Sequence, residues 1–598
     1  MTSQRRLRAV LFLMTPLTLV ACGSQSRPED SSLFEGINLA NNMVEDMNLS
    51  YEAIQGENIY NTADSPWTDS YWPLFGKALA RRWGDLPNSG EKAGGILGIA
   101  DLIQSGSQAV REESLNMNLS PAEKYDILFR YRYGLSLDTQ NIQALVSKIG
   151  AFEKEADATE AMDVKKSKTS DIYLELFESN SSKGTRSQFP MTTDSLSDYL
   201  RYNKSKNYKF LNEIGEGSDW GWMGLCHGWA PAAIMAKTPK SHVVVSLDDK
   251  KLILTQGDLR GLLTYSWANY APRSEFWGTR CNIDVENPAS VGPVDTHGRG
   301  YTGKIILSDG QEKNFFQIRE VRGLVDQRYA DAVYNQAMIV KFDDANKTIG
   351  VLYQVVRSST PRNRQQPWEL YADTKSLLQT LRKAGSNGTS VKLEIFGCWD
   401  TNPATFHTAL VEKLGKEKLG FVMDRTQAGQ VWNQPVHKAK TVVGKAISIG
   451  ELSLERLRHI TPGTAFVAEV VSEVEWLAEP SDPEMSYTPE FEEDYNHTSK
   501  FKYILEFDRR GKMIGGEWGN LESVQPESES GKQQIPDFLF AYKQGQKPHD
   551  NLTNGFDYTQ IIDKIHACSL DEPTTTIDVA GKAEPAVECT IQKVRPTP

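Results

Sequence analysis

The chain has 598 residues, more than one hydrophobic core accommodates, and this length predicts three or four domains. Hydrophobic residues make up 39% of the chain and charged residues 24%, as in ordinary soluble globular proteins. The 66 basic and 78 acidic residues give a net charge of −12. An acidic chain without a basic stripe argues against nucleic acid as a partner.

The first residues have the pattern of an export signal. Three arginines precede an apolar run from Ala9 to Ala21, which is too short to span a membrane. The run ends in Leu19-Val20-Ala21-Cys22, which resembles the lipobox of bacterial lipoproteins. We therefore expect a lipoprotein signal peptide over residues 1–21, lipidation of Cys22 and anchoring to the bacterial envelope, with Gly23 favouring the outer membrane. The alternative is an ordinary cleaved signal with an incidental cysteine.

The next segments read as a tether followed by helices. Residues 22–33 are polar and are predicted to be a tether, and residues 34–165 are predicted to be a mainly helical region. Ser120 has the character of a helix N-cap, with Pro121 in the first helical position and Glu123 in the first turn. A helix is therefore expected from Pro121 onward.

The remaining chain is predicted to form a mixed α/β region over residues 166–445 and a β-rich region over residues 446–598. In the second of these, Phe501–Phe507 and Lys512–Trp518 flank Asp508-Arg509-Arg510-Gly511, which predicts a hairpin. The acidic stretch Asp482–Asp494 contains two prolines and is predicted to be an exposed loop. No Walker, Rossmann or EF-hand pattern is present.

Six cysteines are present, and export to an oxidising compartment would let disulfides persist. They are residues 22, 226, 281, 398, 568 and 589. Setting aside Cys22 and Cys226 leaves four cysteines, which allow three pairings. We favour a local Cys568–Cys589 bridge and a long Cys281–Cys398 bridge, while the other pairings stay open.

Cys226 is the best candidate for a nucleophile. It follows Gly221 and Gly224 and precedes a helix-forming run that Pro231 allows to begin at about His227 or Gly228. A cysteine at a helix N-terminus meets unpaired N–H groups that favour the thiolate and can hold an oxyanion. The alternative is a buried structural cysteine beside aromatic side chains.

His407 is the best candidate for a base. The segment around it reads as two strands joined by a two-residue turn at Gly415-Lys416, which would place His407 directly opposite Asp424 on one sheet face. Asp424 could then accept the His407 N–H and stabilise the imidazolium. The alternative is a cross-strand hydrogen-bonded pair without a catalytic role.

Other histidines carry weaker signals. His227 adjoins the nucleophile, His297 has no acidic residue at a telling spacing, and His437 lies past the expected hairpin. No spacing of histidines and cysteines matches a zinc site, so no metal ligands are expected.

Several of these motifs together resemble the transglutaminase-elicitor family, which has oomycete and bacterial members. The matching residues are Cys226-His227-Gly228-Trp229-Ala230-Pro231-Ala232, Asn402-Pro403, Phe406-His407, Asp424 and Val431-Trp432-Asn433-Gln434-Pro435-Val436. The last run is six consecutive identities, and the resemblance covers about residues 50–545. This sequence departs from the family's elicitor segment after Val436.

The resemblance implies an α+β fold with a papain/transglutaminase-like core and a triad of Cys226, His407 and Asp424. It implies a transglutaminase that joins glutamine side chains to lysine amines or polyamines through a Cys226 thioester. The backbone N–H of Cys226, with Trp220 or Trp222, is the expected oxyanion site. The chemistry requires no cofactor, but family members are calcium-dependent, and Asp482–Asp494 is the candidate segment for calcium. Two alternatives remain: a deamidase or cysteine protease with the same triad, and a non-catalytic surface interaction lipoprotein.

Overall fold

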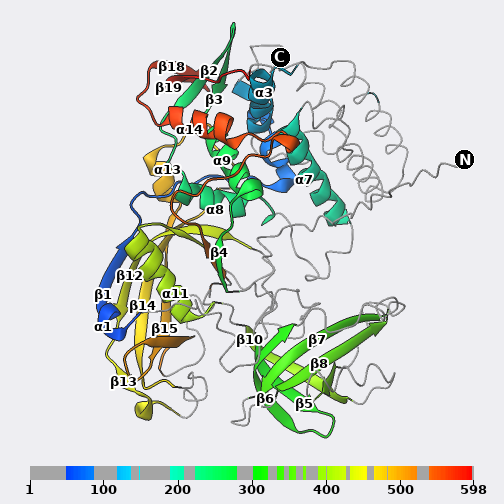
Figure 1. Cartoon of the computed structure of the whole chain (residues 1–598), viewed down its shortest axis with the longest axis vertical. Coiled ribbons are helices and arrows are strands. Elements are labelled where there is room, and N and C mark those ends of the chain that lie inside the picture. The colour runs from blue at the N-terminus through cyan, green and yellow to red at the C-terminus, as the bar shows by residue number, and fades with distance from the viewer. Residues whose placement is uncertain are drawn as a thin grey trace, which may run out of the picture. The chain divides into compact units, whose positions relative to one another are not determined.

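The computed structural model describes a defined part of the chain (Figure 1). The described residues are 49–85, 117–135, 147, 189–207, 222–278, 301–320, 333–342, 349–357, 368–371, 388–398, 401–425, 431–453, 463–480, 482–521, 536 and 538–594. All of them belong to the compact unit Ile37–Pro598. The expected signal peptide and tether, and with them Cys22, lie outside the described residues, as do Trp220, Cys281 and His297.

A nine-stranded antiparallel sheet organises this unit, in the order β16-β15-β14-β12-β11-β17-β4, with β1 paired to β12 and β13 paired to β14. Its strands are β1 (Gly56–Asn61), β4 (Glu275–Gly278), β11 (Phe421–Asp424), β12 (Asn433–Val443), β13 (Ile447–Ser448), β14 (Phe466–Leu477), β15 (Asn496–Phe507), β16 (Met513–Trp518) and β17 (Phe538–Ala541). The predicted hairpin is confirmed, because β15 pairs with β16 around Asp508–Gly511.

The sheet crosses two of the expected region boundaries. β12 pairs with β14 and β11 pairs with β17, so the boundary expected at residue 445 falls inside one sheet. β1 lies in the region expected to be helical but adds a strand to the same sheet. The chain mixes helices and sheets, as the α+β fold class predicts.

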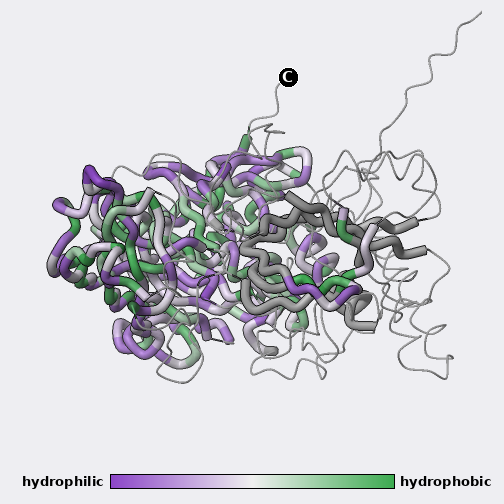
Figure 2. Tube along the Cα trace, turned by 90° about the horizontal axis from the view of Figure 1, so that it is seen from below, coloured by the Kyte–Doolittle hydropathy of each residue, from purple (hydrophilic) through white to green (hydrophobic). Residues whose placement is uncertain are grey.

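Alternating side chains give the sheet two separate buried faces. Val422, Phe538 and Phe540 pack into one core, which also receives helix α8, and we call it the α8 core. Their neighbours Phe421, Met423 and Leu539 pack into a second core, which also receives helix α11, and we call it the α11 core. Successive residues of a strand point to opposite faces, so the sheet separates the two cores. Hydrophobic and hydrophilic stretches are interspersed along the coloured part of the chain in Figure 2.

Four longer helices lie in the α8 core or beside it. These are α3 (Pro121–Tyr133), α7 (Pro190–Asn207), α8 (Cys226–Met235) and α9 (Gln256–Tyr270). The start predicted for α3 is confirmed, because Ser120 and Glu123 form a capping box and Pro121 occupies the first turn. Gly228 lets α8 approach α9 closely, since a Cβ at this position would collide with the Thr264 carbonyl. Among the described residues, no helix combines the length and apolar character that crossing a membrane requires.

The α11 face is covered by shorter elements. They are α1 (Tyr51–Ile54), α11 (Pro403–Ala409) and the π-helix η10 (Leu410–Glu417), which continues directly from α11. Residues Phe406, Leu410 and Leu414 lie four positions apart and are all buried in the α11 core. This spacing is what holds the two helical segments against the sheet.

A four-stranded sheet joins the C-terminal part of the chain to the segment after α8. Its order is β18-β19-β2-β3, from β18 (Thr575–Val579), β19 (Lys582–Thr590), β2 (His242–Leu247) and β3 (Lys250–Leu254), with β19 and β2 parallel. The predicted Cys568–Cys589 disulfide is present and ties α14 (Asp563–Ser569) to β19. A bridge closing a loop of this length stabilises by about 3 kcal/mol on the chain-entropy model. The second expected bridge cannot be placed, because Cys281 is not among the described residues.

A closed six-stranded barrel is inserted between β4 and α11. Its order is β10-β5-β6-β7-β8-β9, from β5 (Tyr301–Leu307), β6 (Glu312–Glu320), β7 (Val333–Phe342), β8 (Ile349–Arg357), β9 (Trp368–Tyr371) and β10 (Thr389–Cys398). All its pairings are antiparallel. The sequence predicts one mixed α/β region over residues 166–445 and no separate barrel within it.

Candidate active site

Cys226 is the first residue of α8 and is only 4% exposed. The helix therefore begins one residue before the earliest start that the sequence predicted, and Pro231 lies inside it. Proline has no N–H to donate to the carbonyl four residues earlier, so this turn of α8 lacks one hydrogen bond. Cys226 nevertheless lies at a helix N-terminus, as predicted, and the positive end of a helix dipole favours a thiolate there.

The side chain that faces the sulfur comes from the start of β12. The Asn433 Nδ2 amide donates to the Cys226 Sγ at 3.4 Å, and the Cys226 thiol lies 3.7 Å from the Val431 carbonyl. Both Asn433 and Cys226 are buried. Asn433 belongs to the run Val431–Val436 that resembles the family, and no local sequence pattern indicates a role for it. The sulfur thus sits between a helix N-terminus and a fixed amide donor.

Asp424 lies directly beside Asn433. The two residues are register partners in β11 and β12, so their side chains share a sheet face. Asp424 lies two residues after Val422, which packs in the α8 core, and this places Asp424 on the face toward α8. Its Oδ1 accepts the backbone N–H of Trp432 at 3.2 Å, which fixes the turn that carries Val431 and Asn433.

The expected hairpin between His407 and Asp424 is wrong. His407 lies on α11, whose N-cap Asn402 accepts the Ala404 N–H at 2.7 Å, and Pro403 occupies the first helical position. Gly415 and Lys416 lie within the π-helix rather than in a turn. The helix instead ends at Lys418, which is in the left-handed region with φ 55°.

His407 is buried on the other side of the sheet from Cys226. Its Nδ1 bonds the Tyr503 hydroxyl at 2.7 Å, and that hydroxyl bonds the Ser472 Oγ at 2.8 Å. Tyr503 belongs to the α11 core, whereas Asp424 faces α8. Within the described part of the chain, His407 Nε2 has no hydrogen-bond partner. The structure therefore brings Cys226 and Asp424 to one face and does not bring His407 to them.

Burial lowers the pKa of His407 to about 3. Between that value and its ordinary pKa near 6.5, the unfolded chain binds a proton that the folded chain does not. The stability contributed by neutral His407 is complete above about pH 6.5 and is lost as the pH falls toward 3. This loss reaches about 1.4 kcal/mol per pH unit.

We predict that His407→Leu changes stability and not chemistry. The free energy of unfolding should fall by about 1–3 kcal/mol near neutral pH, because Tyr503 loses a buried partner. The difference in unfolding free energy between about pH 7.5 and pH 5 should shrink by about 2 kcal/mol, because the titrating group is gone. Urea unfolding at both pH values measures this, and the turnover number for amine incorporation should stay within about threefold of wild type. A folded His407→Leu variant without activity would contradict this prediction and support His407 as the catalytic base.

The other residues expected at the site have different positions. Trp222 is half-buried and packs against the α8 core, and no oxyanion role is assigned to it; Trp220 lies outside the described residues. The segment Asp482–Asp494 is not an exposed loop throughout, since it contains α13 (Pro489–Asp494).

Two carboxylates of the acidic segment expected to bind calcium are already paired with arginines. Asp482 is paired with Arg81 at 2.9 Å, and Glu492 with Arg260 at 2.7 Å. Calcium needs six to eight oxygen ligands, and these carboxylates already serve arginines. Among the residues that the structure describes, no group of three or more histidine, cysteine, aspartate or glutamate side chains could hold a metal ion.

Comparisons with known proteins match the part of the chain that supplies Asp424 and Asn433. The crystal structure of the GP42 transglutaminase from Phytophthora sojae is similar, at 16% identity and a TM-score of 0.39, over 88% of this chain and 95% of that one. No curated protein matches. The sequence model described as Transglutaminase elicitor matches residues 397–569. Over these residues, the resemblance to the transglutaminase-elicitor family that the sequence motifs indicate is confirmed.

Proposed function

We propose that this protein is a cysteine-dependent transglutaminase with Cys226 as its nucleophile. The observation that carries the proposal is the contact between Cys226 and Asn433. Asn433 lies in the family-matched residues 397–569, whereas Cys226 reaches the same point from a helix outside them. A sulfur at a helix start with an amide donor beside it suits attack on a carboxamide.

The proposed reaction has two half-steps. In the first, the Cys226 thiolate attacks the γ-carbonyl carbon of a glutamine, the carbon–nitrogen bond breaks, and ammonia leaves after taking up a proton. In the second, a primary amine attacks the thioester, loses a proton and regenerates the thiol as the isopeptide bond forms. Lysine side chains and polyamines are the proposed amine substrates.

The oxyanion donors that we propose for each half-step are two in number. They are the backbone N–H of Cys226 and the Nδ2 of Asn433. Asp424 acts on the site by holding the Trp432 N–H, and with it the turn before Asn433. We assign no proton transfer to His407, because it lies on the far face of the sheet. His297, the next histidine that the sequence offers, is outside the described residues.

The proposed activity is tested by incubating the full-length protein with a glutamine-containing protein and a fluorescent primary amine. Covalent fluorescence in the glutamine protein, with ammonia released in equal amount, is the expected result. Ammonia release without amine incorporation would instead make the protein a deamidase. Neither product at any tested calcium concentration would reject the catalytic proposal.

We also propose that the protein is exported and held at the bacterial envelope by a lipid on Cys22. The support is the apolar run that ends in Leu19-Val20-Ala21-Cys22. Mass spectrometry of the mature N-terminus should find acylated Cys22 as the first residue, and Cys22→Ser should release the protein from membranes. An unmodified Cys22 or cleavage elsewhere would contradict this proposal.

A further inference from the structure

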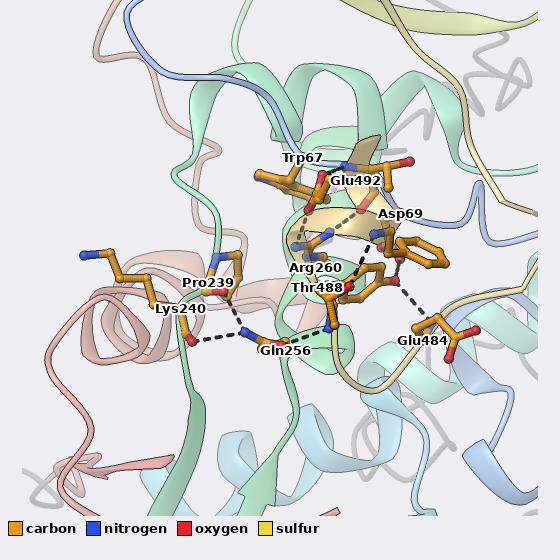
Figure 3. Close-up of polar contacts among 12 residues, drawn as sticks. Trp67, Asp69, Pro239, Lys240, Gln256, Arg260, Glu484, Thr488 and Glu492 are labelled. Atoms are coloured by element: carbon orange, nitrogen blue, oxygen red, sulfur yellow. Dashed lines mark hydrogen bonds and ion pairs between the residues drawn. The ribbon is translucent and has the colours of Figure 1, made fainter. Parts of the chain in front are cut away.

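The acidic segment 482–494, which we call the strap, contacts the chain next to α8 through a buried arginine of α9. Arg260 is 1% exposed and donates from one guanidinium nitrogen to the Thr68 carbonyl and from the other to Glu492 at 2.7 Å. The second Glu492 oxygen accepts the Thr68 N–H at 2.7 Å. One arginine and one glutamate therefore bind both backbone polar groups of Thr68. Figure 3 shows Arg260 beside Glu492.

Tyr487 of the strap contacts both Arg260 and the same segment of chain. The Arg260 guanidinium lies over the Tyr487 ring, 3.6 Å from its centroid, and also over the Trp67 ring at 5.3 Å. The Tyr487 hydroxyl donates to one oxygen of Asp69, and the other oxygen accepts the Trp72 indole N–H at 2.9 Å. A planar guanidinium between two rings with two directed acceptors has little freedom to move.

Residues 67–74, which these side chains contact, lie along α8, and we call this segment the brace. At the C-terminal end of α8, the Trp67 indole N–H donates to the Ala236 carbonyl at 2.9 Å. Near the N-terminal end, the Leu225 N–H donates to the Tyr71 carbonyl at 2.5 Å, and the Leu74 N–H donates to the Met223 carbonyl at 2.9 Å. The brace thus contacts both ends of the helix that begins with Cys226.

The brace lies directly against the backbone that precedes Cys226. A Cβ at Gly224 would collide with the Tyr71 carbonyl, so the brace and the residues before Cys226 are in direct backbone contact. The Tyr71 ring also meets the Trp432 ring edge-on at 5.7 Å, and Trp432 precedes Asn433. The brace therefore contacts the residues that precede both partners of the Cys226–Asn433 contact.

We infer that Arg260, together with Glu492, is a positioning residue for the nucleophile: it fixes the brace, and the brace fixes Cys226 relative to Asn433. A buried ion pair contributes little net stability over apolar packing, so stability alone gives no reason for a charged pair here. A displacement of about 1 Å at a reacting group can cost about 100-fold in rate. The inference deepens the proposed function and rests on it for the catalytic readout.

The test compares Arg260→Met, Arg260→Lys and Glu492→Gln in the full-length chain, at a temperature where near-ultraviolet circular dichroism shows each to be folded. Two quantities are measured: the turnover number and KM for amine incorporation, and the rate of Cys226 alkylation by iodoacetamide, followed on the Cys226 peptide by mass spectrometry. Arg260→Met should lower the turnover number about 10- to 100-fold with KM within about threefold, and slow alkylation about tenfold.

Arg260→Lys should recover part of the loss, because one ammonium can bond Thr68 or Glu492 but cannot bridge both in the plane of a guanidinium. The matched control is Arg132→Met. Arg132 is also largely buried and pairs with Asp557 at 2.9 Å, but it lies on α3, and its hydrogen bonds run to Asp557 and Gln592, away from the brace. Arg132→Met should lower the melting temperature and leave both the turnover number and the alkylation rate unchanged.

Folded Arg260→Met with wild-type turnover and alkylation would overturn the inference and leave Arg260 a stabilising residue only. If Arg260→Met does not fold, wild-type values in both Arg260→Lys and Glu492→Gln overturn it equally. The alkylation rate needs no amine transfer. Wild-type protein that incorporates no amine, yet shows slower Cys226 alkylation in the Arg260 variants, would reject the proposed function and retain the positioning role.

Discussion

Cys226→Ala is expected to abolish amine incorporation, with a loss of at least about 1000-fold in the turnover number. Without the sulfur no thioester can form, and no other nucleophile replaces it at the start of α8. The fold should persist, because the side chain is small and the change removes a single buried atom from the end of a helix. The measurement is fluorescent amine incorporation by the purified variant, beside its melting temperature.

The matched control for this change removes the two cysteines of the disulfide. Cys568→Ala with Cys589→Ala breaks the disulfide and should cost about 3 kcal/mol of stability without touching the site. Its turnover number should remain close to wild type under conditions where it is folded. Amine incorporation that survives in Cys226→Ala would contradict the thioester mechanism and move the nucleophile elsewhere.

The second large effect is expected at Asn433. Asn433→Ala should lower the turnover number about 100- to 1000-fold, as the loss of one oxyanion donor does in acyl transfer, while KM changes little. The reason is that its amide donates at the sulfur, where the substrate oxygen of a tetrahedral intermediate would lie within reach. Asn433→Asp keeps the size of the side chain but sets a carboxylate beside the thiolate, so it should be no more active than alanine.

Gln434→Ala is the control for Asn433. Gln434 is the next residue of β12 and points to the other face, where its amide contacts Arg425 and Glu479. It should change the turnover number by less than about tenfold. Equal losses in Asn433→Ala and Gln434→Ala would mean that the strand as a whole, and not the Asn433 amide, supports the reaction.

Local sequence signals succeeded where neighbouring residues alone decide the conformation. The capping box at Ser120 and Glu123 and the hairpin at Asp508–Gly511 form as predicted, because their hydrogen bonds close within a few residues. The start of α8 was predicted to within one or two residues from its glycines and alanines. The Cys568–Cys589 bridge also joins residues only 21 positions apart.

The segment around His407 shows where such reasoning fails. A glycine-lysine pair between apolar residues was interpreted as a hairpin turn, although Asn402 and Pro403 carry a helix start. Phe406, Leu410 and Leu414 fit a helical period, and burying them against the sheet stabilises the helical form. The predicted pairing of His407 with Asp424 assumed that both residues lie on strands. It is wrong because His407 lies on a helix.

Short motifs and composition predict the nucleophile candidate, the start of its helix, the family resemblance and the α+β class. The side chains that meet Cys226 depend instead on contacts between distant segments. Asn433 reaches Cys226, with Asp424 beside Asn433, because β11 and β12 pair in one register. Arg260 of α9 is held by Glu492, which lies more than 200 residues further along the chain. Such contacts between distant segments leave no local pattern, because the side chains that meet are chosen by sheet register and helix packing and not by their neighbours in sequence.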